Sequence, residues 1–104
     1  MGKRVPHYAL DQVKDLIRSG AFRVTRTAMA TATRDFGFVA HSQLVDVVLA
    51  LTVKHFYKSM TTQFDTSIWQ DVYHGLIGES KAYIKLQIVN DESVVISFKD
   101  LEHG

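Results

Sequence analysis

The chain has 104 residues, and its content of 46% apolar and 11% aromatic residues is sufficient for one packed core, so we expect a single domain spanning 1–104. It has no cysteine, which excludes disulfides and thiol chemistry, and its histidines show no short ligand spacing, so we expect neither a metal site nor a cofactor. The net charge of +1 does not indicate a class of partner. No apolar run is long enough to span a membrane, and the N-terminus lacks a hydrophobic signal segment, which together predict a cytoplasmic protein without membrane partners.

The N-terminal quarter is basic. Up to Arg26 it carries six cationic residues against Asp11 and Asp15, an excess of four positive charges: Lys3, Arg4, Lys14, Arg18, Arg23 and Arg26. A solvated helix face and a surface that follows phosphates are equally compatible with this bias. It permits nucleic acid binding and does not require it.

The first half of the sequence predicts three helices and one short strand. Apolar residues at helical spacing begin after Pro6 and end before Gly20, a natural helix stop: Leu10, Val13, Leu16 and Ile17. A strand at 22–25 follows, and then an Ala-rich helix that Thr25 or Thr27 can cap and that runs to Thr33.

Ser42 is the expected N-cap of the third helix, which reaches about Leu51. Its apolar residues are too widely spread for a surface helix: Leu44, Val45, Val48, Leu49 and Leu51. From His55 onward the apolar period changes to two, which predicts strands near 55–62, 67–74, 80–89 and 93–99. The expected fold is therefore α+β, with the helices on one face of a mainly antiparallel sheet.

The last two strands form a hairpin with one apolar and one polar face. On the first strand Ala82, Ile84, Leu86 and Ile88 alternate with Lys81, Tyr83, Lys85 and Gln87, and on the second Val94, Ile96 and Phe98 alternate with Val95, Ser97 and Lys99. The apolar faces coincide only when the loop has an odd number of residues. A loop at 90–92 places Tyr83 opposite Lys99, whereas a loop at 91–93 places Lys85 opposite Lys99; either register gathers a phenol and two ammonium groups on one face.

The segment FYKSMTTQFDTSIWQDVY, at 56–73, predicts a second hairpin with Lys58 and Gln70 inside otherwise apolar strands. A loop at 63–65 would make these two residues cross-strand neighbours. The alternation is ambiguous here, because large apolar residues occupy both faces, and it does not decide which face is core.

Four segments together resemble the MqsR family, the toxin half of a bacterial toxin-antitoxin system: KRVPHYALDQVKDLI, FYKSMTTQFDTSIWQDVY, AYIKL and VVISFK. The resemblance extends from Lys3 to Lys99, and KSMTT followed by IWQDVY is its most specific element. Between 27 and 53 the match is in length and pattern rather than in letters. The segment NDES between the last two strands is one residue longer than the family's turn.

This resemblance implies a RelE-like endoribonuclease that cleaves messenger RNA at short GC-containing triplets and arrests growth. It also implies an antitoxin partner, MqsA, which itself binds zinc and operator DNA, so that contact with DNA is only indirect. We expect that partner to add a strand to a sheet edge or to cover a sheet surface, with 22–25 and 56–62 as the candidate edges.

The family's proposed catalytic residues correspond to Lys58, Gln70, Tyr83 and Lys99. Such a site needs no metal, since the RNA 2′-hydroxyl can attack the adjacent phosphate if the protein moves protons and stabilises the phosphorane charge. We expect Tyr83 and Lys99 around the scissile phosphate, Lys58 as charge stabiliser or base, and Gln70 as an orienting donor.

For RNA binding we expect His7, Lys85 and Arg23. For His7, packing at the start of the first helix is at least as good an interpretation. The alternative to an enzyme is a binding module without chemistry, in which the lysines only neutralise phosphate. A third interpretation is a DNA-binding regulator that uses the helix at 42–51. It is disfavoured because apolar residues are spread around that helix, which we therefore expect to be buried.

Overall fold

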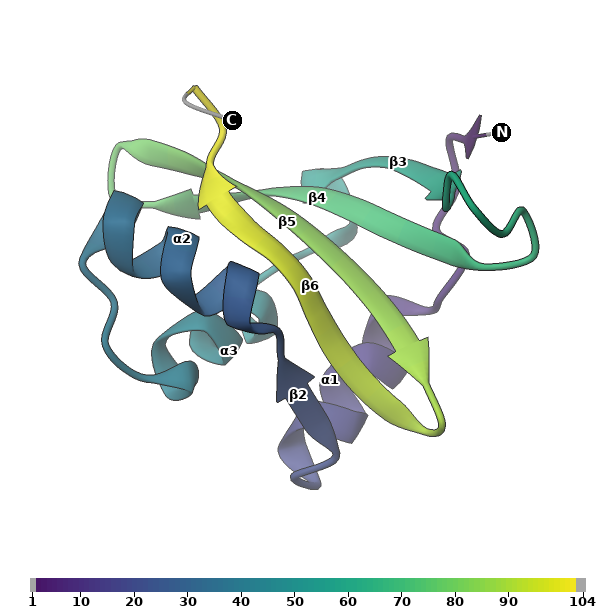
Figure 1. Cartoon of the computed structure of the whole chain (residues 1–104), viewed down its shortest axis with the longest axis horizontal. Coiled ribbons are helices and arrows are strands. Elements are labelled where there is room, and N and C mark those ends of the chain that lie inside the picture. The colour runs from purple at the N-terminus through teal and green to yellow at the C-terminus, as the bar shows by residue number, and fades with distance from the viewer. Residues whose placement is uncertain (1, 103–104) are drawn as a thin grey trace.

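The computed structural model describes residues 2–102 as three helices and one six-stranded sheet (Figure 1). The elements in chain order are β1 (Gly2–Lys3), α1 (Leu10–Arg18), β2 (Phe22–Val24), α2 (Arg26–Phe36), α3 (His41–Leu49), the 3-10 turn η1 (Val53–His55), β3 (Phe56–Thr61), β4 (Trp69–Ile77), β5 (Ser80–Val89) and β6 (Glu92–Asp100). The strand order is β1-β3-β4-β5-β6-β2, and only β2 runs parallel to its neighbour. The expected α+β architecture is confirmed. No helix within 2–102 is long and apolar enough to cross a membrane.

Side-chain caps account for two of the helix starts. The Thr25 hydroxyl accepts a hydrogen bond from the backbone N–H of Ala28 at 3.1 Å, so Thr25 and not Thr27 caps α2, which continues past Thr33 to Phe36. The prediction of Ser42 as the cap of α3 is wrong. The N-cap is Ala40, two residues earlier, and the Gln43 side-chain oxygen accepts the backbone N–H groups of Val39 and Ala40.

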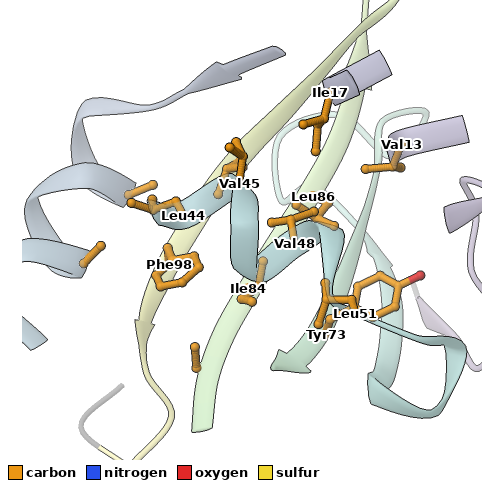
Figure 2. Close-up of a cluster of buried hydrophobic side chains, with 14 of the residues drawn as sticks. Val13, Ile17, Leu44, Val45, Val48, Leu51, Tyr73, Ile84, Leu86 and Phe98 are labelled. Carbon is orange, nitrogen blue, oxygen red and sulfur yellow. The ribbon is translucent and has the colours of Figure 1, made fainter. Parts of the chain in front are cut away.

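All three helices contribute to one core against one face of the sheet. Figure 2 shows Val13 and Ile17 of α1 and Leu44, Val45 and Val48 of α3 facing Tyr73, Ile84, Leu86 and Phe98 of the central strands. Gly75 of β4 lies against the end of α3 and the residues that follow it. A Cβ atom there would be only 2.8 Å from the Ile84 side chain and 3.2 Å from that of Leu51, so this position requires glycine or a shift of its neighbours.

The final hairpin differs from expectation in its loop but not in its central pair. The loop has two residues, Asn90 and Asp91, with φ of 50° and 61°, as a type I′ turn requires. The three-residue loop is therefore wrong. The additional residue lies inside β6, where Ile96 forms a β-bulge between the pairs Lys85–Ser97 and Leu86–Val95.

The bulge restores the predicted register beyond it. Tyr83 pairs with Lys99 and Ile84 with Phe98, so the alternative register with Lys85 opposite Lys99 is wrong. Between the turn and the bulge, the residues of β6 face the opposite side from the one predicted, so Val95 and not Ile96 belongs to the core.

The predicted cross-strand pair of Lys58 and Gln70 is wrong. Lys58 pairs with Val72 and Gln70 with Met60, because the connection between β3 and β4 spans 62–68 and is centred one residue later in the chain than a loop at 63–65. Since Tyr73 of β4 packs against the helices, the alternate residues of that strand, Gln70 among them, face the other way. We call this helix-free side the open face.

The outer strands of the sheet are β1 and β2. The expectation of an edge at 22–25 is confirmed by β2. The expectation for 56–62 is wrong, because β1 lies outside β3 and pairs with Ser59 and Met60.

Candidate functional site

Tyr83 occupies the centre of the open face. On one side its cross-strand neighbour is His74 of β4, and on the other it is Lys99 of β6. The next row holds Lys85, flanked by Val72 and Ser97, and Val72 in turn pairs with Lys58 of β3. Four adjacent strands thus bring Lys58, Lys85 and Lys99 around one phenol.

The side chains of this group lie within one neighbourhood. The Nζ atoms of Lys99 and Lys85 are 5.2 and 5.8 Å from the centre of the Tyr83 ring. A hollow of about 340 Å³, called here the central hollow, is lined by Tyr57, Lys58, His74, Tyr83, Lys99 and Leu101. Cationic and phenolic groups that converge on one concavity are suited to a phosphate.

Burial and like charges tune two of these groups in opposite senses. The pKa of Lys85 is lowered by burial and then by the positive charges of Lys99 and Lys58. The pKa of Tyr83 is raised by burial and then by Tyr57. Near neutral pH, Tyr83 therefore remains a phenol that can donate a proton, whereas Lys85 loses its proton more easily than an ordinary lysine.

Gln70 lies outside the central hollow. It is on the open face, but its Nε2 donates to Oε1 of Gln87 at 3.0 Å, two positions along β4 from Val72. The structure thus brings Lys58, Tyr83 and Lys99 together at the central hollow, and fixes the amide of Gln70 farther along the same face.

The three residues expected to bind RNA have different positions. Lys85 lies beside Tyr83. Arg23 is exposed near the far end of the last hairpin, 3.5 Å from a carboxylate oxygen of Glu92. His7 stacks on Trp69 with ring centres 5.3 Å apart, and Trp69 belongs to the helix side of β4, so His7 does not face the central hollow.

Contacts of the N-terminal segment explain the position of His7. The carboxylate of Asp71 accepts the backbone N–H groups of His7 and Tyr8 at 3.0 and 2.9 Å, and the Tyr8 hydroxyl donates to the Trp69 carbonyl at 2.8 Å. These bonds attach the segment after Pro6 to β4. His7 therefore has a packing role in this structure.

Sequence reasoning missed Tyr57 and His74. Their rings stack with centres 4.2 Å apart, and the buried Nε2 of His74 has no hydrogen-bond partner among residues 2–102. Burial, and then the charge of Lys81, lowers the pKa of His74. The available signal was the alternation of β4, since positions 70, 72 and 74 must share a face.

Comparison with known proteins gives the family. The family model described as "Motility quorum-sensing regulator, toxin of MqsA" matches residues 5–100. The chain belongs to the MqsR toxin family. A curated member, the mRNA interferase toxin MqsR of Escherichia coli strain K12, is 39% identical over 103 residues, which cover 96% of this chain and 99% of that protein.

The MqsR match includes β2 to β6, and therefore every strand that lines the central hollow, whereas β1 lies before the matched residues. It also includes the helices that cover the other face, so the strands that line the central hollow and the helices that support them lie within the matched residues. The resemblance noted from sequence motifs is thereby confirmed over nearly the whole chain.

Proposed function

We propose that this chain is an endoribonuclease toxin that cleaves messenger RNA at short GC-containing triplets without a metal and is neutralised by an MqsA-like antitoxin. The observation that carries the proposal is the convergence of Lys58, Lys99 and the Tyr83 phenol on one hollow of the open face, with Lys85 beside the Tyr83 ring. The family model describes a toxin of MqsA, and the E. coli relative is named an mRNA interferase, which supports the same reading.

The reaction divides into three tasks. The 2′-oxygen of one ribose bonds to the adjacent phosphorus and loses its proton, the bond to the 5′-oxygen of the next nucleotide breaks, and that oxygen gains a proton. The products are a 2′,3′-cyclic phosphate and a 5′-hydroxyl. Side chains must accept one proton, donate another and stabilise the negative charge of the phosphorane.

The geometry supports an assignment of these tasks. Lys58 and Lys99 line the central hollow and stabilise the phosphorane charge. Tyr83, kept protonated by burial, donates toward the leaving 5′-oxygen, and Lys85, whose pKa is lowered, accepts the 2′ proton. Gln70, held by Gln87, orients the RNA farther along the face.

A substrate with a single altered sugar tests this proposal. A short RNA that contains one GC triplet should be cut in excess chelator to a cyclic phosphate and a 5′-hydroxyl, as resolved by mass spectrometry. The same RNA with a 2′-deoxy sugar 5′ of the scissile phosphate should remain intact because the nucleophile is missing. Cleavage of the deoxy substrate would contradict the mechanism, and loss of activity in chelator that one metal restores would contradict its metal independence.

A further inference from the structure

A second hollow adjoins the central hollow at the edge of the sheet. It has a volume of about 580 Å³, and we call it the edge hollow; its lining residues are Gly2, Lys3, Arg4, Phe56, Tyr57, Lys58 and Ser59. Tyr57 and Lys58 line both hollows. A ligand that leaves the central hollow past these two residues therefore enters the edge hollow directly.

The edge hollow forms where the outer strand is shorter than its neighbour. In β1, Gly2 pairs with Met60 and Lys3 with Ser59, and the strand then ends. If the same antiparallel register continued by one residue, Arg4 would lie opposite Lys58, and both residues line the hollow. Strand alternation directs Gly2 and Arg4 to the side of the open face and Lys3 to the other side.

The contacts of Lys3 and Arg4 differ accordingly. Lys3 is engaged by the protein, since its Nζ is 3.1 Å from Nδ1 of His7 and 4.3 Å from the centre of the Trp69 ring. Arg4 is exposed, and its guanidinium makes neither a hydrogen bond nor an ion pair within the described residues. Neither hollow has an acidic residue in its lining.

The position of Arg4 is constrained by its surroundings. The strand pairing of β1 precedes it, and the bonds from His7 and Tyr8 to Asp71 follow it. An arginine held in this way loses less conformational entropy when it binds an anion than one on a free tail would. Its planar guanidinium suits the two oxygens of a phosphodiester.

An extended strand of nucleic acid matches these features better than a folded protein does. The path from Lys99 through Lys58 to Arg4 is cationic, and Tyr57, which is 53% exposed, lies at the junction as a surface on which a base can stack. An acidic protein segment would need only the charges, whereas continuity with the central hollow favours the substrate itself.

We infer that the edge hollow is an RNA subsite in which Arg4 binds a backbone phosphate on one side of the cleavage position. This inference rests on the proposed function for the location of the scissile phosphate. It assigns Arg4 to substrate binding and to none of the proton transfers.

Binding of uncleavable RNA tests it. Fully 2′-O-methylated oligonucleotides of two kinds are used, a short one limited to the GC triplet and longer ones extended on the 5′ or the 3′ side, and fluorescence anisotropy gives Kd over a series of salt concentrations. Arg4→Gln should weaken binding of one extended oligonucleotide about tenfold and reduce its salt slope by about 0.7, while the short one is unaffected. Arg4→Lys, which keeps the positive charge, should weaken binding of that oligonucleotide less than Arg4→Gln does.

The matched control is Arg26→Gln, which removes the same charge at the first residue of α2, where the side chain is also exposed and unpaired within the described residues. It should bind every oligonucleotide as the wild-type protein does. Equal loss for short and extended RNA in Arg4→Gln would overturn the subsite. So would unchanged RNA binding together with weaker binding of the antitoxin, which would make the edge hollow a protein-docking surface.

Cleavage of the unmodified short RNA is measured in parallel. If the wild-type protein cuts no RNA but Arg4 still determines binding of an extended oligonucleotide, the proposed catalysis fails and the subsite stands. If the wild-type protein cuts the short RNA and Arg4→Gln binds extended RNA normally, only the subsite fails.

Discussion

Tyr83 and Lys99, the proposed proton donor and one of the two proposed charge stabilisers, are held side by side on the open face by neighbouring strands. Both side chains are half-buried and belong to the sheet surface and not to the hydrophobic core. Their substitution should therefore separate activity from stability. A structural role would affect both together.

For Lys99→Ala and Tyr83→Phe we expect cleavage of a short RNA to fall by a factor of about 10² or more, since each removes a charge or a proton donor from the central hollow. The thermal midpoint should change by no more than a few degrees, as for other sites outside the core. Single-turnover kinetics and a thermal melt measure the two effects. Lys54→Ala, an exposed lysine of η1, is the control with normal activity. Wild-type rates in either test variant would remove that residue from the site.

His74 should make stability depend on pH. Its pKa in the folded protein is lowered by burial and by Lys81, so its contribution to stability is full above the unfolded value of about 6.5 and is lost as pH falls through the folded pKa. His74→Phe keeps a ring against Tyr57 but cannot titrate.

The free energy of unfolding, measured in urea at pH 7.5 and pH 5, should therefore decrease less in His74→Phe than in the wild-type protein. Other titrating groups are the same in both proteins and cancel in the comparison. An equal or larger decrease in the variant would show that protonation of His74 does not oppose folding.

The hairpin of β5 and β6 is the element that aligns the site. Its type I′ turn directs both strands, and the bulge at Ile96 shifts the register so that Lys99 meets Tyr83. The turn lies at the opposite end of the hairpin from this pair. Changes in the turn should therefore alter stability more than catalysis.

Asp91 tests the turn because its φ is 61°, a conformation that glycine adopts without cost and β-branched residues adopt poorly. Asp91→Gly should stabilise the protein by up to about 1 kcal/mol, and Asp91→Val should destabilise it by about 1–2 kcal/mol. Urea denaturation gives both values. A valine variant as stable as the wild-type protein would argue against a type I′ turn.

The bulges mark the limit of what the sequence could predict. Alternation predicted the strands and the pair of Tyr83 and Lys99, but counting residues cannot tell whether an additional residue lies in a loop or inside a strand at Ile96. The wrong partner for Lys58 has a different cause, since the loop between β3 and β4 spans 62–68 and not 63–65. Hydrogen bonds among Thr62, Asp65 and Ser67 hold the longer loop, and these depend on local geometry that periodicity does not encode.

The candidate site was likewise predictable only in part. Family resemblance identified Lys58, Tyr83 and Lys99, and the structure brings them to one hollow. The sequence could not show that the Gln70 side chain bonds to Gln87 and does not lie beside Lys58. His74 escaped notice because its relation to Tyr83 is a property of the β4–β5 pairing and not of any local motif.

In the whole molecule, the helices cover one face of the sheet (Figure 1). The strand register places Lys58, Lys85 and Lys99 on the other face. The edge strand β2 lies at the opposite side of the sheet from β3 and the edge hollow. An antitoxin that pairs with β2 would leave the central hollow accessible to a small substrate.

We expect the antitoxin to bind at this edge and to inhibit by excluding bulky substrates such as structured RNA or ribosomes. Short oligonucleotides should then be cut by the complex at rates near those of the free toxin, while long messenger RNA is protected. Equal protection of short and long RNA in a stoichiometric complex would instead show that the antitoxin covers the site directly.

We infer that this lysine and tyrosine site cleaves messenger RNA by itself. Incubation of the purified protein with naked messenger RNA in excess chelator, followed by mapping of every new 5′ end, tests this inference. We expect new 5′-hydroxyl ends at one recurrent GC-containing triplet with the wild-type protein and none with Lys99→Ala. The absence of new ends with the wild-type protein, or the same ends with Lys99→Ala, would contradict the inference.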